Sequence, residues 1–151
     1  MSEVINPTET SNAAKGTNSS TDRLLSAESD VDPLISVVMP TLNEEEGIRE
    51  CITRIKRALN ELEALGEIVI SDSSTDRTPE IARDMGAIVV EPDEPGYGYA
   101  YRYAFERVRG EYIVMGDADT TYDFGAIPRL FEPVQNGATD ICMGSRLNGD
   151  I

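Results

Sequence analysis

Residues 33–62, PLISVVMPTLNEEEGIRECITRIKRALNEL, contain the two kinds of segment from which the whole chain is built. Residues 33–40 are a run of apolar and β-branched residues that ends in proline, which is typical of a strand covered on both faces. Asn43 then stands where a helix cap is expected, and three glutamates follow at the positive end of the helix. Apolar residues recur at helical spacing at Ile48, Cys51, Ile52, Ile55, Leu59 and Leu62. The stretch therefore predicts a buried strand followed by an amphipathic helix within 41–62.

The same alternation continues along the chain. Further strands are predicted over 67–71, 87–91, 112–116 and 139–144, and further helices over 78–86, 97–110 and 125–137. In the second helix Thr78 is the expected cap and Gly86 the expected stop. This order predicts an α/β fold with a mostly parallel sheet and helices on both faces. Because the chain stops just after the last predicted strand, we expect the sheet to be incomplete at its C-terminal end, with an uncovered edge.

The composition narrows the possible partners. The chain has 151 residues, with 28 acidic and 13 basic side chains and a net charge of −15. Such a charge repels nucleic acid and anionic membranes, so we expect neither as a partner. An acidic, lysine-poor surface favours a protein that works in concentrated salt, although an ordinary acidic cytosolic protein is the alternative.

Other residue types exclude whole classes of site. The absence of histidine excludes His-dependent triads and His metal sites. Cys51 and Cys142 are predicted to be buried apolar residues rather than a disulfide or a metal pair.

Residues 1–32 are rich in Ser, Thr, Asn and Glu and predict a disordered acidic leader, so that the domain would begin at residue 33. No apolar run reaches the length of a transmembrane segment or signal peptide, so we expect a cytoplasmic chain.

The polar residues of interest all follow predicted strands. Ligands of parallel α/β sheets bind beyond the carboxyl ends of the strands. Residues 40–44, 71–76, 117–119 and 145–146 meet this condition, so one crevice should receive them all. The tyrosines of 97–110 lie at helical spacing and are predicted to pack and to cover part of that crevice.

Residues 111–124, EYIVMGDADTTYDF, place two carboxylates at the end of a buried strand. Asp117 and Asp119 could bind Mg²⁺ or Mn²⁺, since both cations prefer oxygen ligands and accept substrate phosphates. They also fit the Asp-x-Asp-x-Thr pattern of haloacid dehalogenase-like phosphatases, with Asp117 as nucleophile, but no lysine follows Lys56 to bind the phosphoryl group. A solvated polar turn is the third possibility. From these residues alone the three alternatives stay open.

Several motifs in order make the chain resemble the family 2 glycosyltransferases of the GT-A fold, and in particular the polyprenyl-phosphate sugar transferases. They are VVMPTLNEEEGI (37–48), IVISDSSTDRTPEIA (68–82), YIVMGDADTTYDF (112–124) and MGSR (143–146). The resemblance covers nearly all of 34–151. It implies an inverting, metal-dependent transferase that takes a sugar from a GDP- or UDP-linked donor and passes it to a polyprenyl or dolichyl phosphate. The complete enzyme would act at the cytoplasmic face of the membrane, and this chain would be its donor-binding half.

The resemblance also implies roles for individual residues. Asp117 and Asp119 would hold Mg²⁺ or Mn²⁺ and the diphosphate, with Asp119 as the catalytic residue, and Asp72 would bind the base or ribose. The whole implied donor site comprises Pro40, Thr41, Leu42, Asn43, Glu44, Asp72, Asp117, Ala118, Asp119 and Arg146. Two positions depart from the family pattern: Ser71 replaces the first of two aspartates, and Leu42 stands where tyrosine is frequent. A catalytically inactive nucleotide-binding fragment is the alternative from another functional class.

Overall fold

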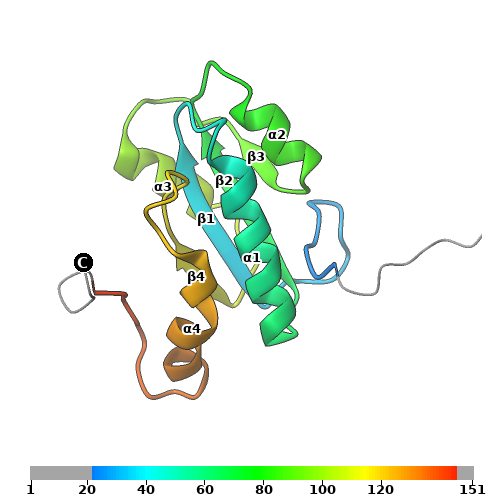
Figure 1. Ribbon diagram of the computed structural model, residues 1–151, viewed down its shortest axis with the longest axis vertical. Coiled ribbons are helices and arrows are strands. Elements are labelled where there is room, and N and C mark those ends of the chain that lie inside the picture. The colour runs from blue at the N-terminus through cyan, green and yellow to red at the C-terminus, as the bar shows by residue number, and fades with distance from the viewer. Residues whose placement is uncertain (1–21, 146–151) are drawn as a thin grey trace, which may run out of the picture.

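The computed structural model describes residues 22–145, which form a four-stranded parallel sheet with flanking helices (Figure 1). The strands are β1 (Ile35–Thr41), β2 (Gly66–Asp72), β3 (Ile88–Val90) and β4 (Tyr112–Met115), in the order β3-β2-β1-β4. The two longest strands, β1 and β2, with seven residues each, occupy the centre of the sheet. The predicted α/β class and the parallel sheet are confirmed.

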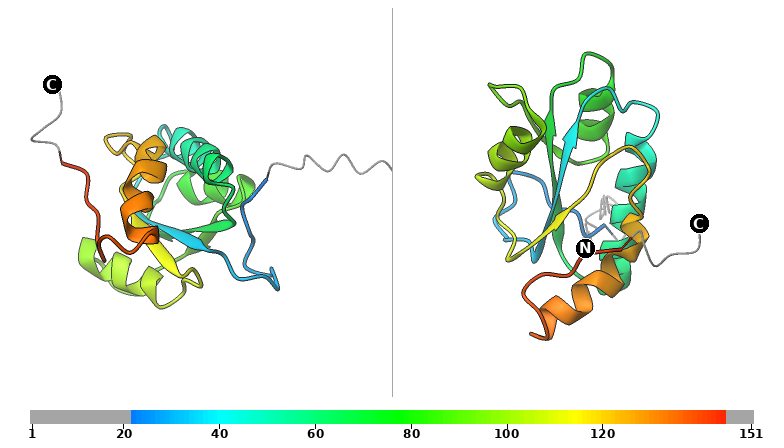
Figure 2. Two further views of the ribbon diagram at one scale, coloured as in Figure 1. Left: turned by 90° about the horizontal axis from the view of Figure 1, so that it is seen from below. Right: turned by 90° about the vertical axis from the view of Figure 1, so that its left-hand side faces the viewer.

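Helices cover both faces of the sheet (Figure 2). Side chains of β1 alternate between the faces, as in any strand. Val37 and Met39 belong to the larger core beneath α1 (Ile48–Leu62), whereas Val38 packs with Tyr101 and Ala104 on the opposite side. The larger core also holds α2 (Thr78–Asp84), the 3₁₀ turn η1 (Phe124–Ala126) and α4 (Ile127–Gln135), while α3 (Tyr97–Phe105) covers the other face.

The predicted fifth strand does not form within the described residues. Residues 139–145 have no strand structure, and Ile141 and Met143 are 74% and 82% exposed. Their hydrogen bonds are local: the Thr139 hydroxyl donates to the Ile141 carbonyl at 2.8 Å. Cys142 is half-buried rather than buried for the same reason, while Cys51 is buried as predicted. An apolar run becomes a strand only where another strand accepts its hydrogen bonds, which the sequence pattern alone does not specify.

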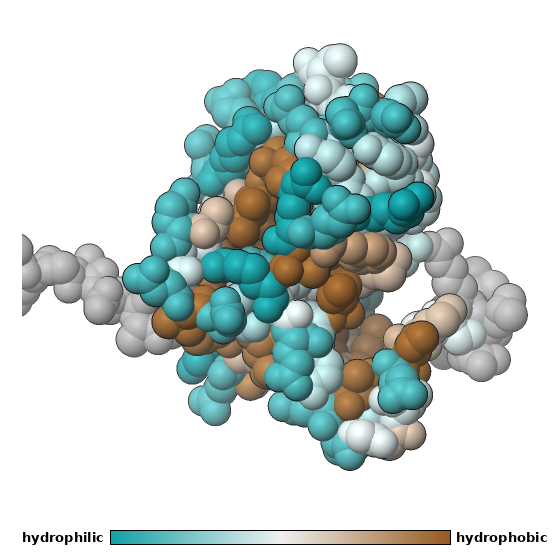
Figure 3. Space-filling view, turned by 180° about the vertical axis from the view of Figure 1, so that it is seen from behind, coloured by the Kyte–Doolittle hydropathy of each residue, from teal (hydrophilic) through white to brown (hydrophobic). Residues whose placement is uncertain are grey.

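The edge strand β4 accordingly has an open apolar face. Ile113 and Met115 are the register partners of Ser36 and Val38, so they lie on the α3 side of the sheet. Both are exposed, because α3 packs on β1 and β2 and does not reach across β4. Figure 3 shows apolar side chains on this side of the molecule. One outer edge of the sheet in the described residues is therefore β4, whereas the sequence predicted an uncovered edge beyond a fifth strand.

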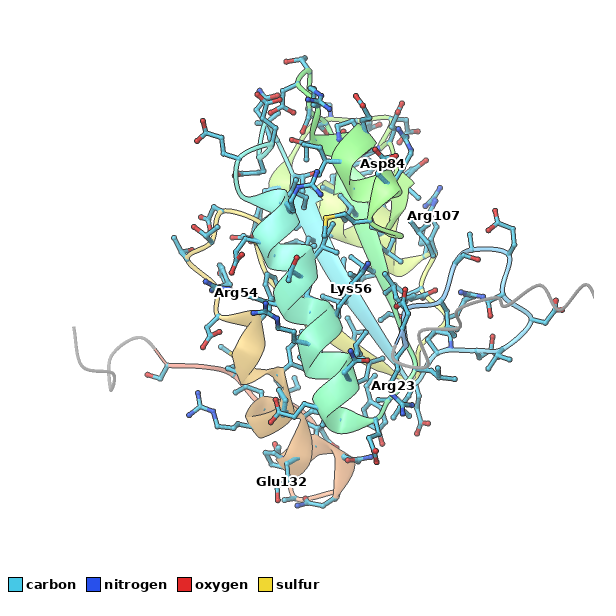
Figure 4. The ribbon with its side chains drawn as sticks, turned by 45° about the vertical axis from the view of Figure 1, so that its right-hand side comes forward. Arg23, Arg54, Lys56, Asp84, Arg107 and Glu132 are labelled. Carbon is cyan, nitrogen blue, oxygen red and sulfur yellow. The ribbon has the colours of Figure 1, made fainter. Side chains whose placement is uncertain are left out.

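Residues 22–32 contact the sheet, so the predicted disordered leader, residues 1–32, extends too far along the chain. The Leu25 amide donates to the Gly66 carbonyl at 2.7 Å, and the Gly66 amide donates to the Arg23 carbonyl at 3.0 Å. The Arg23 guanidinium also donates to the Glu63 carbonyl at the end of α1, at 3.0 Å (Figure 4). The polar composition did not reveal this segment, because most of its hydrogen bonds to the sheet are between backbone groups and only Leu24 packs an apolar side chain against the larger core. The prediction for residues 1–21 lies outside the described residues.

A buried ion pair ties the same segment to the sheet. The Glu67 carboxylate of β2 is fully buried and accepts hydrogen bonds from the Ser36 hydroxyl at 2.7 Å and the Arg109 amide at 2.8 Å. The Arg109 guanidinium pairs with Glu67 at 2.9 Å and donates to the carbonyls of Ser26 and Ser29, both at 2.9 Å. This network, the Glu67–Arg109 clasp, satisfies a buried carboxylate that would otherwise be costly.

Gly110 lies against the clasp and has no room for a side chain. A Cβ atom there would lie 2.6 Å from both the amide nitrogen and the hydroxyl oxygen of Ser36. Gly110→Ala should therefore lower the free energy of unfolding by roughly 1–3 kcal/mol. Gly98→Ala is the matched control: its Cβ would meet nothing within 4 Å in α3, so stability should stay the same or rise by up to about 1 kcal/mol. Urea unfolding of both variants measures the difference, and a fully stable Gly110→Ala variant would contradict the packing.

Candidate functional site

Three loops meet beyond the carboxyl ends of β1, β2 and β4 (Figure 1). They comprise residues 42–47, 73–77 and 116–123 and carry most of the predicted site residues. Gly47 joins the first to the third: a Cβ atom on Gly47 would lie 3.0 Å from the Ala118 carbonyl and 3.1 Å from the Thr120 methyl. The single crevice predicted from the strand ends is consistent with this arrangement.

Asp72 organises the first two loops. It is only 4% exposed, and its Oδ1 accepts hydrogen bonds from the hydroxyls of Thr41 at 2.6 Å and Ser74 at 2.7 Å. The Ser74 amide donates to Oδ2 at 3.2 Å. The carboxylate is therefore already well satisfied by the protein. Contact of Asp72 with a base or ribose stays a prediction.

Asn43 links the same two loops instead of capping a helix. Its side-chain Oδ1 accepts hydrogen bonds from the amides of Thr75 at 2.9 Å and Asp76 at 3.3 Å. Its backbone is left-handed, with φ of 57°, and α1 begins only at Ile48, after Gly47. The predicted Asn43 cap is therefore wrong, because its side chain bonds to a loop 32 residues away.

Thr78 is not a cap either, but the first residue of α2. The Asp76 carboxylate accepts hydrogen bonds from the Thr78 amide at 2.9 Å and from the Thr78 hydroxyl at 2.6 Å. Asp76 therefore has the cap-like role that the sequence predicted for Thr78. The Thr78 hydroxyl oxygen in turn accepts the Glu44 amide at 2.8 Å. The hydroxyl thus bridges two loops, a role that local helix rules do not predict.

Asp117 is held by two tyrosines of α3. Its Oδ1 accepts hydrogen bonds from the hydroxyls of Tyr97 at 2.8 Å and Tyr101 at 3.1 Å. The Tyr101 hydroxyl also lies 3.2 Å from the Gly116 carbonyl. Partial desolvation of the hydroxyls raises the pKa of both tyrosines above the ordinary value, and the hydrogen bond to Asp117 and the charge of Asp117 raise it further, so both hydroxyls are protonated donors. The sequence predicted that these tyrosines pack and cover part of the crevice, but it did not predict the hydrogen bonds from their hydroxyls to Asp117.

Asp119 forms a turn with the residues that follow it. Its Oδ1 accepts the Thr121 amide at 3.0 Å and the Thr121 hydroxyl at 2.6 Å. Thr120, between them, has a φ of 67°, which is uncommon for a β-branched residue and stores backbone strain. The turn interpretation and the metal-ligand interpretation of Asp119 are therefore compatible, since the turn orients the carboxylate.

The donor set of Asp117 and Asp119 fits a hard divalent cation. Both ligands would be carboxylate oxygens, which suit Mg²⁺ or Mn²⁺. Within residues 22–145 no group of three or more acidic, Cys or His side chains is placed to hold a metal ion. Water and ligand phosphates would have to complete the coordination, so the affinity for the cation alone should be modest.

Glu44 adds to the negative charge at this edge. Burial raises its pKa above the ordinary 4.5, and the charges of Asp119, Asp76 and Asp117 raise it further. Ionised Glu44 therefore opposes folding at neutral pH. Glu44→Gln should raise the thermal midpoint slightly at pH 7, and the gain should disappear as the pH falls through the raised pKa towards 4.5.

Thermal melts of Glu44→Gln between about pH 4 and pH 8 measure this effect. Glu46→Gln, at an exposed neighbouring position, removes the same charge and is the control. An equal gain in both variants at every pH would show that the gain reflects only net charge.

The remaining predicted site residues differ in accessibility. Pro40 is half-buried, Thr41 is buried, Leu42 is exposed, and Ala118 is buried with its carbonyl 3.5 Å from the Cys51 sulfur. Arg146 lies outside the described residues. Ser71, noted as a departure, is buried at the end of β2, and its hydroxyl has no hydrogen-bond partner among residues 22–145.

Comparison with known proteins identifies the family. The profile of Glycosyl transferase family 2 matches residues 36–150. The chain is 62% identical over 134 residues to the low-salt glycan biosynthesis hexosyltransferase Agl6 of Haloferax volcanii, a match covering 89% of this chain and 32% of that protein. It is 37% identical over 113 residues to the dolichyl-phosphate hexose transferase of the same organism, covering 75% of this chain and 48% of that protein.

A solved structure agrees with these relatives. Glucosyl-3-phosphoglycerate synthase of Mycobacterium tuberculosis, crystallised with Mn²⁺, UDP-glucose and phosphoglyceric acid, matches with a TM-score of 0.60 and 33% identity, covering 70% of this chain and 40% of that one. This chain spans less than half the length of each of the three proteins. The matches favour the glycosyltransferase interpretation over the phosphatase one. The chain belongs to glycosyl transferase family 2.

Proposed function

We propose that this chain binds the nucleotide-sugar donor of a metal-dependent hexosyltransferase whose acceptor is a polyprenyl or dolichyl phosphate. The observation that carries the proposal is the placement of Asp117 and Asp119 beside the loops that follow β1 and β2. The donor class is supported by the neighbour crystallised with UDP-glucose and Mn²⁺, and the acceptor class by the relative named a dolichyl-phosphate hexose transferase.

In this proposal the three loops bind different parts of the nucleotide-sugar donor. Pro40, Thr41, Leu42, Asn43 and Glu44 line the nucleotide pocket, and Asp72 keeps the loops after β1 and β2 in register. Asp117, Ala118 and Asp119 face the diphosphate, and Arg146 would pair with it through its planar guanidinium. A divalent cation held by the two carboxylates would neutralise charge as the diphosphate leaves.

A phosphate acceptor suits the groups that this chain offers. A phosphate monoester has its second pKa near about 6, so it is already anionic at neutral pH and can attack the anomeric carbon without a strong base. An alcohol acceptor would need a general base. In this proposal Asp117 and Asp119 bind the cation, so their carboxylates are not free to take that proton.

Calorimetric titration tests the donor site. We expect the purified chain to bind one of GDP, UDP or dTDP more tightly with Mn²⁺ than without it. Binding without any sugar transfer would support the alternative of an inactive nucleotide-binding fragment. No binding by a folded chain, judged by circular dichroism, would contradict the proposal.

The charge of the chain predicts a dependence on salt. At net −15, mutual repulsion opposes folding, and about 1 M salt shortens the screening length to roughly 3 Å. The thermal midpoint should rise by several degrees between about 0.1 M and 2 M KCl. A Glu61→Lys/Glu132→Lys variant, changed at two exposed acidic positions, should gain less. An equal gain in both proteins would indicate a general salt effect on hydrophobic burial instead.

The cellular location also stays a prediction. Among residues 22–145, every helix falls short of the length and apolarity that a membrane crossing requires. The cytoplasmic face of the membrane is the expected site of action of the complete enzyme, where it would meet the proposed lipid-phosphate acceptor.

A further inference from the structure

We infer that Tyr97 and Tyr101 make the Asp117–Asp119 site selective for small octahedral cations, Mg²⁺ and Mn²⁺, over Ca²⁺. The inference rests on the proposed metal-dependent donor site and goes further, because it assigns the choice of cation to two residues of α3. The tyrosines would act as positioning residues, since they touch the carboxylate and not the reacting atoms.

The two tyrosines bind one oxygen of the same carboxylate. Their hydroxyls lie 2.8 Å and 3.1 Å from Oδ1 of Asp117, and hydroxyl groups at these distances donate hydrogen bonds to a carboxylate. The single Tyr101 proton is shared between Oδ1 and the Gly116 carbonyl at 3.2 Å. Asp117 is thereby fixed in rotation, with Oδ2 as the oxygen that these hydroxyls do not contact.

Packing of the aromatic rings does not explain why a tyrosine stands at both positions. Tyr101 is buried and packs with Val38, so its ring has a role in the core of the α3 face. Tyr97 is 61% exposed and touches the Tyr101 ring edge-on, with centroids 5.2 Å apart. An exposed phenol gains little from packing. Its hydrogen bond to Asp117 is the interaction that a phenylalanine at this position would lack.

Occupying one carboxylate oxygen restricts how Asp117 can bind a metal. Ca²⁺ takes six to eight oxygen ligands at variable angles and often uses both oxygens of a carboxylate. Mg²⁺ requires near-octahedral geometry and single-oxygen ligands with bound water, and Mn²⁺ shares its preference for oxygen ligands. Two hydrogen bonds occupy both lone pairs of Oδ1, so Asp117 offers Oδ2 to a metal unless one of these hydrogen bonds breaks. The pair therefore disfavours two-oxygen binding and with it the larger cation.

Metal competition tests the inference directly. Free Mn²⁺ is measured by electron paramagnetic resonance in the presence of the full chain and saturating UDP or GDP, whichever binds, and Ca²⁺ is then added as competitor. Comparing variants in identical solutions cancels the binding of metal to free nucleotide. The readout is the ratio of Ca²⁺ to Mn²⁺ affinity, which a general loss of structure would not shift in one direction.

Tyr97→Phe/Tyr101→Phe should raise the Ca²⁺ to Mn²⁺ affinity ratio by roughly tenfold, the scale on which residues that hydrogen-bond to a metal ligand affect metal binding. Tyr97→Phe alone should give part of the shift. Because Tyr97 is exposed, this variant should fold, so the test still decides if the Tyr101→Phe variant is unstable. Tyr99→Phe is the matched control, because it removes a tyrosine–aspartate hydrogen bond, to Asp93, from the same helix.

Each outcome decides between the two proposals. A raised ratio in the Tyr97 and Tyr101 variants, with Tyr99→Phe unchanged, supports the inference. Mn²⁺ binding with the same ratio in every variant would overturn the inference and leave the proposed donor site intact. Absence of Mn²⁺ binding by the unaltered chain would overturn both.

Discussion

Asp119→Ala should abolish Mn²⁺-dependent nucleotide binding, with a loss in affinity on the order of a hundredfold or more, beyond the usual effect of changing a residue that only contacts a metal ligand. The reason is the small number of ligands in the proposed site: it has two carboxylates, and no group of three or more acidic, Cys or His side chains among residues 22–145 is placed to hold a metal ion. Binding in the absence of metal should change little. Calorimetric titration of the chain with its preferred nucleoside diphosphate, with and without Mn²⁺, measures both quantities.

Asp123→Asn is the matched control for charge. Asp123 lies in the same loop, is exposed, and accepts the Gly125 amide at 2.9 Å ahead of η1, an interaction that asparagine can replace. The control removes the same charge from the same loop and should keep Mn²⁺-dependent binding within about twofold, since a lone exposed charge contributes little. If Asp119→Ala behaved like the control, Asp119 would be a turn residue only.

Glu67→Ala should have the largest effect on stability, lowering the free energy of unfolding by about 3 kcal/mol. The substitution leaves the half-buried Arg109 guanidinium without its carboxylate and removes the acceptor of the Ser36 hydroxyl. The thermal midpoint should fall by about 10 °C. Because Arg109 also holds the carbonyls of Ser26 and Ser29, the segment around Leu25 should exchange its amide hydrogens faster.

Thermal melts and hydrogen exchange of Glu67→Ala check the two parts of this expectation. Glu111→Ala, which removes an exposed glutamate two residues from Arg109, is the control and should stay within about 0.5 kcal/mol of the unaltered chain. A Glu67→Ala variant within about 1 kcal/mol would mean that the clasp contributes little to folding, as can happen with buried ion pairs. Unchanged exchange near Leu25 would mean that backbone pairing with Gly66 suffices to hold the segment.

The parts of the fold that were predictable are those governed by short-range pattern. The run at 33–40 became β1, and the apolar stripe from Ile48 to Leu59 became the buried face of α1. The carboxyl-edge rule for parallel sheets also placed Asp72, Asp117 and the loop around Asn43 at one edge without any coordinates. Periodicity and strand order act over a few residues or through general topology, so a single sequence reveals them.

The wrong predictions concern groups that can form hydrogen bonds with more than one possible partner. Asn43 and Thr78 both look like helix caps, and both instead bond to loops more than thirty residues away. Residues 139–144 look like a strand, yet no strand pairs with them in the described part of the chain. In each case the local rule is sound, but a tertiary hydrogen bond, or the lack of a pairing partner, decided the outcome.

The sequence by itself determined the α/β class, the strands β1 and β2, the buried face of α1 and the carboxylates that follow β4, because these depend on patterns within one segment. Only the tertiary structure decided that Tyr97 and Tyr101 bind Asp117, that Asp72 is buried beneath two loops and that Arg109 joins residues 26–29 to β2. These contacts depend on which donors the fold brings within hydrogen-bond distance of a carboxylate. That distance is set by the packing of α3 and the loops on the sheet, and it cannot be read from the spacing of residues along the chain.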